Sequence, residues 1–248
     1  MTDAAVVFDF AQVLPGRFHM PARMTALPLA GGGVALVSPI PIDDALASRV
    51  EALGPVRYLV APNLLHHLYL GAAQARWPSA RVLAPDSLRA KRPDLTIDGA
   101  LEDGLPDDLS ASVEAVKIDG APTVDEHVLF HRASATLVVT DLLFHVVRPR
   151  GLVAHVALWL VGCRGRLAQS RAWRLFVKDR AAAARSARTL MGLDFDRLVP
   201  AHGDVIDLGA RPQVERALAW MLSGEALLAP GRGGATERSR SLTRLVQK

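Results

Sequence analysis

Three strongly apolar segments of the chain each run into a short polar loop that contains histidine or aspartate. Residues 56–60 are followed by His66-His67, residues 136–140 by Asp141, and residues 195–199 by His202-Gly203. Short apolar runs between turn residues predict buried strands. Because α/β proteins assemble sites from the loops at one edge of a sheet, we expect these polar residues to meet in space.

Predicted strands and helices alternate along the chain. In the first half we expect strands at 24–29 and 34–37 joined by a Gly31-Gly32-Gly33 turn, a helix at 43–53, a strand at 56–60, a helix at 68–76 and a strand at 81–84. In the second half we expect loops with one short strand over 86–112, strands at 113–118 and twice within 126–141, a helix at 179–191 with Asp179 as its N-cap, a strand at 195–199 and a helix at 213–223. This order predicts an α/β protein with two similar halves.

Length and composition favour one folded domain over residues 1–228. The chain has 248 residues, half of them hydrophobic, which suffices for a large core. Its one cysteine, Cys163, excludes an intramolecular disulfide and a Cys-rich zinc ribbon, and fits a reducing compartment. The first ten residues carry two aspartates and no basic residue, so we expect no signal peptide and a cytoplasmic location.

The positive charge is concentrated at the C-terminus. Residues 229–248 hold five basic side chains and one acidic side chain, and their net charge of +4 equals that of the whole chain. Their Gly, Ser and Arg content predicts a flexible basic tail, and without interleaved aromatic residues nucleic-acid binding is not expected. The longest apolar run, 151–163, is too short to span a bilayer, so we expect a buried element and no membrane contact.

The histidines and the aspartate allow two interpretations. Imidazole nitrogen and carboxylate oxygen together suit a divalent ion of the zinc or iron type. Alternatively, His66 caps the helix of residues 68–76, His67 binds a backbone carbonyl and Asp141 binds loop amides. No His-Glu-x-x-His or Cys-x-x-Cys motif decides between them, and His145 is a reserve ligand four residues after Asp141.

The order of elements and these three motifs resemble the metallo-β-lactamase fold, most closely its bacterial members of unknown function, over residues 24–210. The resemblance implies a four-layer αββα sandwich. The first metal loop of that fold reads His-x-His-x-Asp-His, and with its last pair on His66-His67 its leading histidines fall on Pro62 and Leu64.

Two further motifs of the fold can be compared. The later Pro-Gly-His element falls near Gly120-Ala121-Pro122, which offers no ligand, whereas Thr-Gly-Asp appears as Thr140-Asp141 and the closing His-Gly as His202-Gly203. The fold binds two metals, and the first of its sites is therefore lost. The resemblance implies a second site made of His66, His67, Asp141 and His202.

The resemblance implies a hydrolase with at most one metal, zinc or iron, that acts on a small ester, thioester, lactone or phosphoester. Asp141 would be a ligand or would orient the attacking water. The alternative is a metal-free, non-catalytic binding or regulatory module that keeps the same scaffold. The positions of His66, His67, Asp141 and His202 in the structure show whether these side chains could share one metal ion.

A basic segment suggests an anionic substrate. Residues 148–188 hold ten basic side chains and one aspartate, and the resemblance places such a segment near the metal edge. Guanidinium and ammonium groups facing the cleft would bind carboxylate or phosphate. The candidates are Arg171, Arg174, Lys178 and Arg180. In the competing interpretation, the segment only neutralises the ten acidic residues of 94–126 or coats a surface helix.

Removal of residues 229–248 is expected to leave the melting temperature nearly unchanged, because this segment has little apolar area to bury. Thermal denaturation of the full chain and of a chain ending at residue 228 checks this expectation. A large decrease in the truncated chain would show that Leu242, Leu245 and Val246 pack against the domain.

Overall fold

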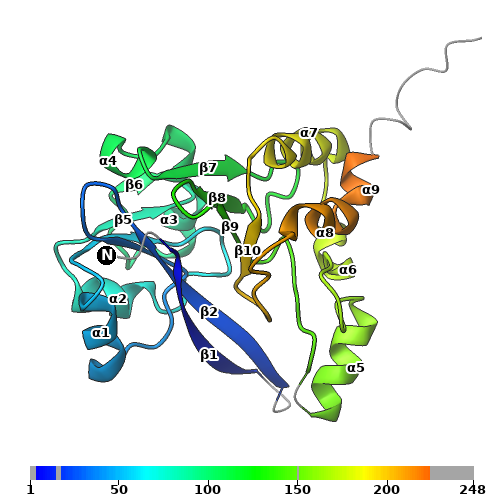
Figure 1. Ribbon diagram of the computed structural model, residues 1–248, viewed down its shortest axis with the longest axis horizontal. Coiled ribbons are helices and arrows are strands. Elements are labelled where there is room, and N and C mark those ends of the chain that lie inside the picture. The colour runs from blue at the N-terminus through cyan, green and yellow to red at the C-terminus, as the bar shows by residue number, and fades with distance from the viewer. Residues whose placement is uncertain (1–3, 15–17, 150, 224–248) are drawn as a thin grey trace, which may run out of the picture.

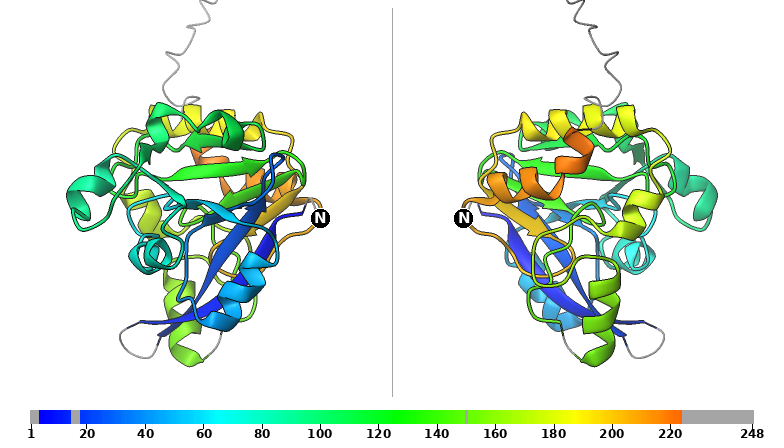
Figure 2. Two further views of the ribbon diagram at one scale, coloured as in Figure 1. Left: turned by 90° about the vertical axis from the view of Figure 1, so that its left-hand side faces the viewer. Right: turned by 90° about the vertical axis from the view of Figure 1, so that its right-hand side faces the viewer.

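The computed structural model describes residues 4–14, 18–149 and 151–223, which form two facing β-sheets with helices on both outer sides (Figures 1 and 2). This is the expected αββα sandwich. The predicted tail, 229–248, lies outside the described residues. No helix within the described residues is long and apolar enough to cross a membrane.

The first sheet contains six strands in the order β1-β2-β3-β4-β5-β6. They are β1 (Val6–Leu14), β2 (Phe18–Pro28), β3 (Val34–Val37), β4 (Val56–Val60), β5 (Arg81–Ala84) and β6 (Gly99–Ala100). Strands β1 to β3 are antiparallel, and β3 to β6 are parallel. The parallel part follows from the helical crossovers that the sequence predicts.

The second sheet has the order β10-β9-β8-β7. Its strands are β7 (Val113–Lys117), β8 (His127–His131), β9 (Thr136–Val139) and β10 (Arg197–Pro200). Strands β7, β8 and β9 are antiparallel neighbours, whereas β9 and β10 run parallel, with Val139 opposite Pro200. The loops that follow β9 and β10 therefore leave the same edge of this sheet.

Helices cover both sheets. They are α1 (Asp44–Glu51), α2 (Leu70–Arg76), α3 (Ser87–Lys91), η2 (Leu101–Asp103), α4 (Asp107–Ser110), α5 (Leu152–Leu160), α6 (Arg171–Leu175), α7 (Arg180–Met191), α8 (Ala210–Ala217) and α9 (Ala219–Leu222). Helix α7 begins at the predicted cap, where Asp179 Oδ1 accepts a hydrogen bond from Ala182 N at 2.9 Å.

The core has three apolar layers. Residues from α1, α2 and α3 pack on the outer face of the first sheet, and residues from α7, α8 and α9 pack on the outer face of the second. Between the sheets lie apolar side chains such as Leu27, Val60, Leu129 and Val199. Residues on both faces of the central strands are buried, which explains why these strands read as continuous apolar runs.

The structure corrects the predicted elements in several places. The apolar run 151–163, expected to be buried, contains helix α5, which has an exposed outer face, and helix α6 was not predicted. Strand β1 and the first half of β2 were not predicted. Residues 86–112 contain α3, β6, η2 and α4 instead of loops with one short strand, and the last helix begins at Ala210 and is divided into α8 and α9. The first half of β2 matters for the candidate site, because the main-chain carbonyl of Pro21 in this strand contacts His202.

A buried carboxylate braces the end of β9. Glu126 is fully buried just before β8, and its Oε1 accepts hydrogen bonds from Thr140 N and Thr140 Oγ1, both at 2.8 Å, whereas its Oε2 has no partner. Burial, together with the charge of the nearby Asp141, raises the pKa of Glu126 to about 8. At neutral pH the carboxyl is therefore largely protonated.

The substitution Glu126→Gln is expected to make stability less dependent on pH. Because the folded-state pKa lies above the unfolded value, the wild-type chain loses stability as the pH rises towards about 8. The glutamine keeps an acceptor for Thr140 and cannot ionise, so its advantage over wild type should grow by about 1–3 kcal/mol between pH 5 and pH 9. Urea denaturation at several pH values, with the exposed Glu215→Gln as control, measures this. An equal difference at every pH would contradict it.

Candidate metal centre

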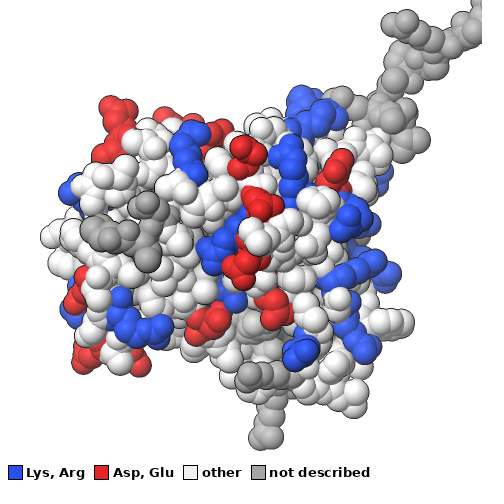
Figure 3. Space-filling model, in the orientation of Figure 1, with Lys and Arg blue, Asp and Glu red and all other residues white. Residues whose placement is uncertain are grey.

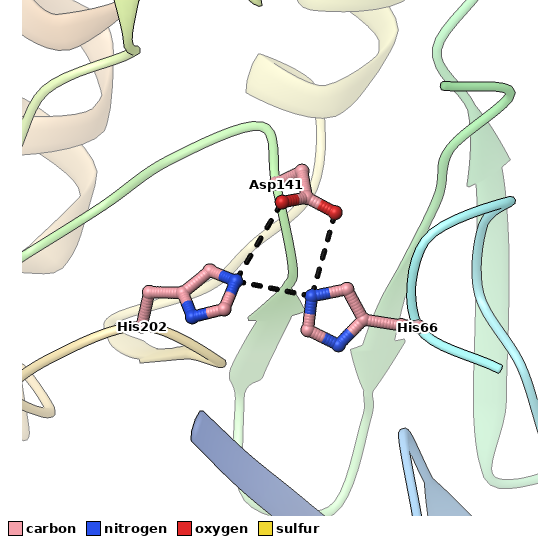
Figure 4. A group of neighbouring side chains, drawn as sticks. All are labelled: His66, Asp141 and His202. Carbon is pink, nitrogen blue, oxygen red and sulfur yellow. Dashed lines mark hydrogen bonds and ion pairs between the residues drawn. The ribbon is translucent and has the colours of Figure 1, made fainter. Parts of the chain in front are cut away.

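Three of the four predicted ligands converge at one edge of the sandwich (Figure 4). Asp141 and His202 each lie two residues beyond the paired positions Val139 and Pro200, so the register of β9 and β10 places them side by side. His66 approaches from the loop between β4 and α2 in the other sheet. Its Nε2 lies 3.1 Å from His202 Nε2 and 3.4 Å from Asp141 Oδ2, and His202 Nε2 lies 3.6 Å from Asp141 Oδ1.

The His202 ring is fixed on two sides. Its Nδ1 donates a hydrogen bond to the main-chain carbonyl of Pro21 at 2.7 Å, so in the neutral ring the lone pair lies on Nε2, towards the centre. Phe144 stacks on the ring with centroids 4.8 Å apart and planes 12° from parallel. The carbonyl comes from β2, the strand whose first half the sequence did not predict.

The loop that carries His202 requires glycine at the next position. Gly203 has φ +106°, and a Cβ there would lie 2.1 Å from the carbonyl oxygen of His145. Main-chain hydrogen bonds, from His145 N to His202 O at 2.9 Å and from Asp204 N to His145 O at 2.7 Å, hold the two segments together. His145 thus supports the loop through its main chain, and its Nδ1 lies 2.8 Å from Asp204 O, outside the group.

Asn63 joins the loops that carry the candidate ligands, and its role was not predicted from the sequence. Its Nδ2 donates to Asp141 Oδ2 at 2.7 Å and to Thr140 Oγ1 at 3.0 Å. Its Oδ1 accepts from the main-chain nitrogens of Leu65 and His66 at 2.8 and 2.7 Å. Its position after Pro62 at a strand end was the available signal, because asparagine commonly bonds the backbone two or three residues further on in turns.

Ser38 positions the His66 ring. Its Oγ lies 2.6 Å from His66 Nδ1, and its backbone has φ +56°, a conformation that is unfavourable for a residue other than glycine. Ser38 follows β3 directly. With Nδ1 engaged by a hydroxyl, His66 presents Nε2 to Asp141 and His202. No sequence pattern predicted this role for serine.

The protonation states suit a metal ligand set. Burial lowers the pKa of His66 to about 4, with His202 and His67 adding to the effect and Asp141 opposing it. Burial alone would raise the pKa of Asp141, but His66, His202 and a hydrogen bond from Asn63 hold it at about 2. At neutral pH the group therefore contains a neutral His66 and an ionised Asp141.

The donor atoms also have suitable spacing for one ion. A zinc ion bound tetrahedrally to nitrogen and oxygen at about 2.0–2.1 Å separates its ligands by about 3.3 Å. The separations in the group are 3.1, 3.4 and 3.6 Å, with the two carboxylate oxygens of Asp141 facing different histidines. Two imidazoles and one carboxylate are a known set for catalytic zinc and for non-haem iron. The residues present therefore fit a divalent ion.

The structure does not bring His67 into this group. His67 is buried, and its Nδ1 lies 3.0 Å from Nη1 of Arg92, which is itself bound by Asp94. Burial and the charges of Lys91 and Arg92 lower the pKa of His67. The predicted convergence of His67 with Asp141 and His202 is thus corrected: in the turn that holds both histidines, neighbouring side chains point to different sides, and His66 is the one that faces Asp141.

Pro62 and Leu64, where the resemblance placed the leading histidines of a first metal loop, make other contacts. Leu64 packs against the core of the first sheet, and its amide nitrogen donates to Val124 O at 3.0 Å, while Pro62 O accepts from His127 N at 2.8 Å. Among the described residues, His66, Asp141 and His202 form the only group of three potential ligands close enough to share an ion.

A pocket of about 370 Å³ opens beside the group. Besides His66, Asp141 and His202, its lining is mainly apolar. The apolar and aromatic members are Met20, Ala22, Pro39, Ile40, Leu65, Leu68, Tyr69 and Phe144. None of Arg171, Arg174, Lys178 and Arg180 lines this pocket, and Arg174 lies over the Trp220 ring at 5.2 Å.

No protein-family model matches the sequence, and no curated protein sequence matches it. Solved structures do match the fold. A metallo-β-lactamase from Pontibacter korlensis has a TM-score of 0.60 and 13% identity, with 90% of this chain and 96% of that chain covered. The metallo-β-lactamase FIM-1 from Pseudomonas aeruginosa, in its mono-zinc form, has a TM-score of 0.53 and 16% identity over 93% and 95% of the two chains.

A third match extends beyond the lactamases. The flavodiiron core of Flv1 from Synechocystis has a TM-score of 0.58 and 12% identity, covering 88% of this chain and 59% of that one. These identities are low, and what the matched structures share with this chain is the arrangement of elements. The chain therefore has the metallo-β-lactamase fold, and the His66, Asp141 and His202 group lies at one edge of it.

Proposed function

We propose that the protein is a hydrolase that uses one divalent ion, zinc or iron, held by His66, Asp141 and His202. The observation that carries the proposal is the convergence of two imidazole nitrogens and a carboxylate beside an apolar pocket. When bound, such an ion would lower the pKa of a water molecule and so supply hydroxide near neutral pH. An ester, thioester or lactone is the substrate class we favour.

The chain's own residues would bind and orient the reactants. Asn63 holds Oδ2 of Asp141, and we assign Oδ1 to orienting the water. Pro21 and Ser38 keep the two imidazoles in place through their Nδ1 atoms. The apolar walls of the pocket would exclude other water molecules, which strengthens each electrostatic interaction inside it.

The lining favours a neutral substrate with an apolar group. Among the described residues that line the pocket, Asp141 is the only aspartate or glutamate, and no lysine or arginine is present. Apart from the proposed ion, whose charge Asp141 partly offsets, an anionic group of a substrate would find no cation in the pocket lining. We therefore replace the expected anionic substrate with a small neutral one that has an apolar acyl or alkyl part.

A metal-free binding module is the second candidate, and one observation favours it. His66 can donate from Nε2 to Nε2 of His202, 3.1 Å away, while its Nδ1 accepts from Ser38 Oγ, so the polar atoms of the ring find partners without an ion. In that case the pocket would bind the same kind of neutral ligand without hydrolysing it. Metal content separates the two candidates.

Protein purified from zinc- or iron-supplemented medium is expected to contain no more than one tightly bound equivalent of metal. The double substitution His66→Ala/His202→Ala removes two of three ligands and should reduce the content to background. Elemental analysis after dialysis measures both. The matched control is His67→Gln, which should keep the metal, because His67 faces Arg92. Loss of metal in this control, or two equivalents in wild type, would contradict the proposed site.

Neutral esters with longer apolar acyl chains are expected to be better substrates than acetyl or carboxylate-bearing esters. The substitution Leu68→Asp at the pocket should raise KM for the longer esters about tenfold with little change in kcat, because it removes apolar contact. Steady-state assays of matched esters test this, with Leu208→Asp, outside the pocket, as control. A preference for the anionic esters would refute the neutral substrate class.

A further inference from the structure

Helix α5 leaves an apolar face uncovered. Its nine residues include no charged side chain, and five of them are between 49% and 79% exposed. These five are Leu152, Val153, Val156, Trp159 and Leu160. Single exposed apolar side chains scattered over a surface are normal, but five of them together on one short helix mark an interaction site.

The exposed residues form one face of the helix, and the fold does not need them. Their spacing of one, four, seven and eight residues after Leu152 is that of one helical face. The opposite face buries Ala154 and Leu158, and Leu158 packs with Val146 and Cys163. Helix α5 is therefore anchored on its inner side, and its outer face remains available.

The patch lies at an end of the molecule. Helix α5 and the ends of β1 and β2 project together at the bottom of Figures 1 and 2. There Val13, near the end of β1, is 58% exposed, and Val147, in the segment leading to α5, is 42% exposed. An apolar end that projects from the molecule can contact a membrane or a partner without steric hindrance from the rest of the protein.

Two basic residues, Arg164 and Arg166, follow the C-terminal end of α5, and Arg164 lies opposite Val146, which packs with Leu158 of the helix. Residues 142–178 contain seven lysines and arginines and no aspartate or glutamate. Arg164, Arg166 and Lys178 are exposed, and none of them forms an ion pair with an acidic side chain of the described residues. Figure 3 shows lysine and arginine side chains along the edge on which α6 and α7 lie.

We propose that the α5 face docks on the surface of an anionic lipid bilayer. An apolar helix face with a tryptophan, flanked by basic residues, has the composition of elements that lie in the membrane interface, where apolar burial and attraction to anionic lipids act together. Trp159 would lie at headgroup level, and Arg164 and Arg166 would contact lipid phosphates. Contact with a membrane surface thus replaces the expectation of no membrane contact, and it does not depend on the proposed hydrolase.

The alternative occupants fit less well. In a symmetric dimer through α5, the same basic residues would face each other, because a twofold interface repeats the same patch on both subunits. That arrangement concentrates positive charge without an acidic partner. A nucleic acid would need stacked aromatic residues, whereas the centre of the patch is mainly aliphatic.

Vesicle flotation with the full chain tests the proposal. Binding to vesicles that contain phosphatidylglycerol is expected to exceed binding to phosphatidylcholine vesicles and to fall as salt is added. The double substitution Arg164→Gln/Arg166→Gln should lower the partition coefficient about 25-fold, at about fivefold for each basic residue near the anionic surface. The double substitution Leu152→Ser/Trp159→Ser should lower it by about tenfold or more through lost apolar burial.

The control is Leu208→Ser, which removes a leucine that is 78% exposed beside Asp207, the partner of Arg197 at the start of β10. It should leave vesicle binding unchanged, and light scattering with circular dichroism should show all variants folded. Equal binding to both vesicle types, equal loss in the control, or no binding at all would overturn the proposal. The α5 face would instead belong to a dimer interface if two results came together: the wild-type chain does not bind vesicles and is a dimer, and the Leu152→Ser/Trp159→Ser variant is a monomer.

Discussion

The parallel pairing of β9 with β10 is the constraint on which the candidate site depends. Because Val139 pairs with Pro200, the two loops leave the sheet at the same level, and Asp141 and His202 become neighbours although 61 positions separate them. Arg23 of β2 extends this arrangement to the other sheet, since its Nη1 donates to Pro200 O at 2.8 Å while Asp9 holds its other nitrogens. A change in this register would separate the candidate ligands Asp141 and His202 without altering either residue.

Buried polar contacts join the two sheets at both ends of the sandwich. At the site edge, Asn63 connects the loop of His66 to Thr140 and Asp141. At the opposite edge, His131 of β8 lies 2.8 Å from Pro28 O of β2 and is also bonded to Ser134. Since a buried polar group is costly without a partner, each contact favours one relative position of the sheets, whereas apolar packing alone would allow several.

The distribution of charge distinguishes the pocket from the outer surface. The pocket beside His66, Asp141 and His202 is lined mainly by apolar side chains. The described arginines of 148–188 do not line it, and Arg171, for example, donates to Leu160 O at the end of α5 at 3.4 Å. The molecule thus has both an apolar pocket and an apolar outer helix face. Both features arise from residues that the fold leaves partly exposed.

The sequence by itself determined the central strands and helices and most of the candidate site. Strands β4 and β5 have the predicted bounds because apolar runs between turn residues have few alternatives, and Asp141 and His202 were predictable because they follow neighbouring strands. Strand β1 was also within reach, since Phe8 and Phe10 alternate with Asp9. Only the tertiary structure decided between His66 and His67, because their side chains point to different sides of one turn. The tertiary structure also decided the roles of Ser38, Asn63 and the carbonyl of Pro21. These groups hydrogen-bond to residues that are distant in the sequence, and a sequence pattern does not specify which distant segments become neighbours.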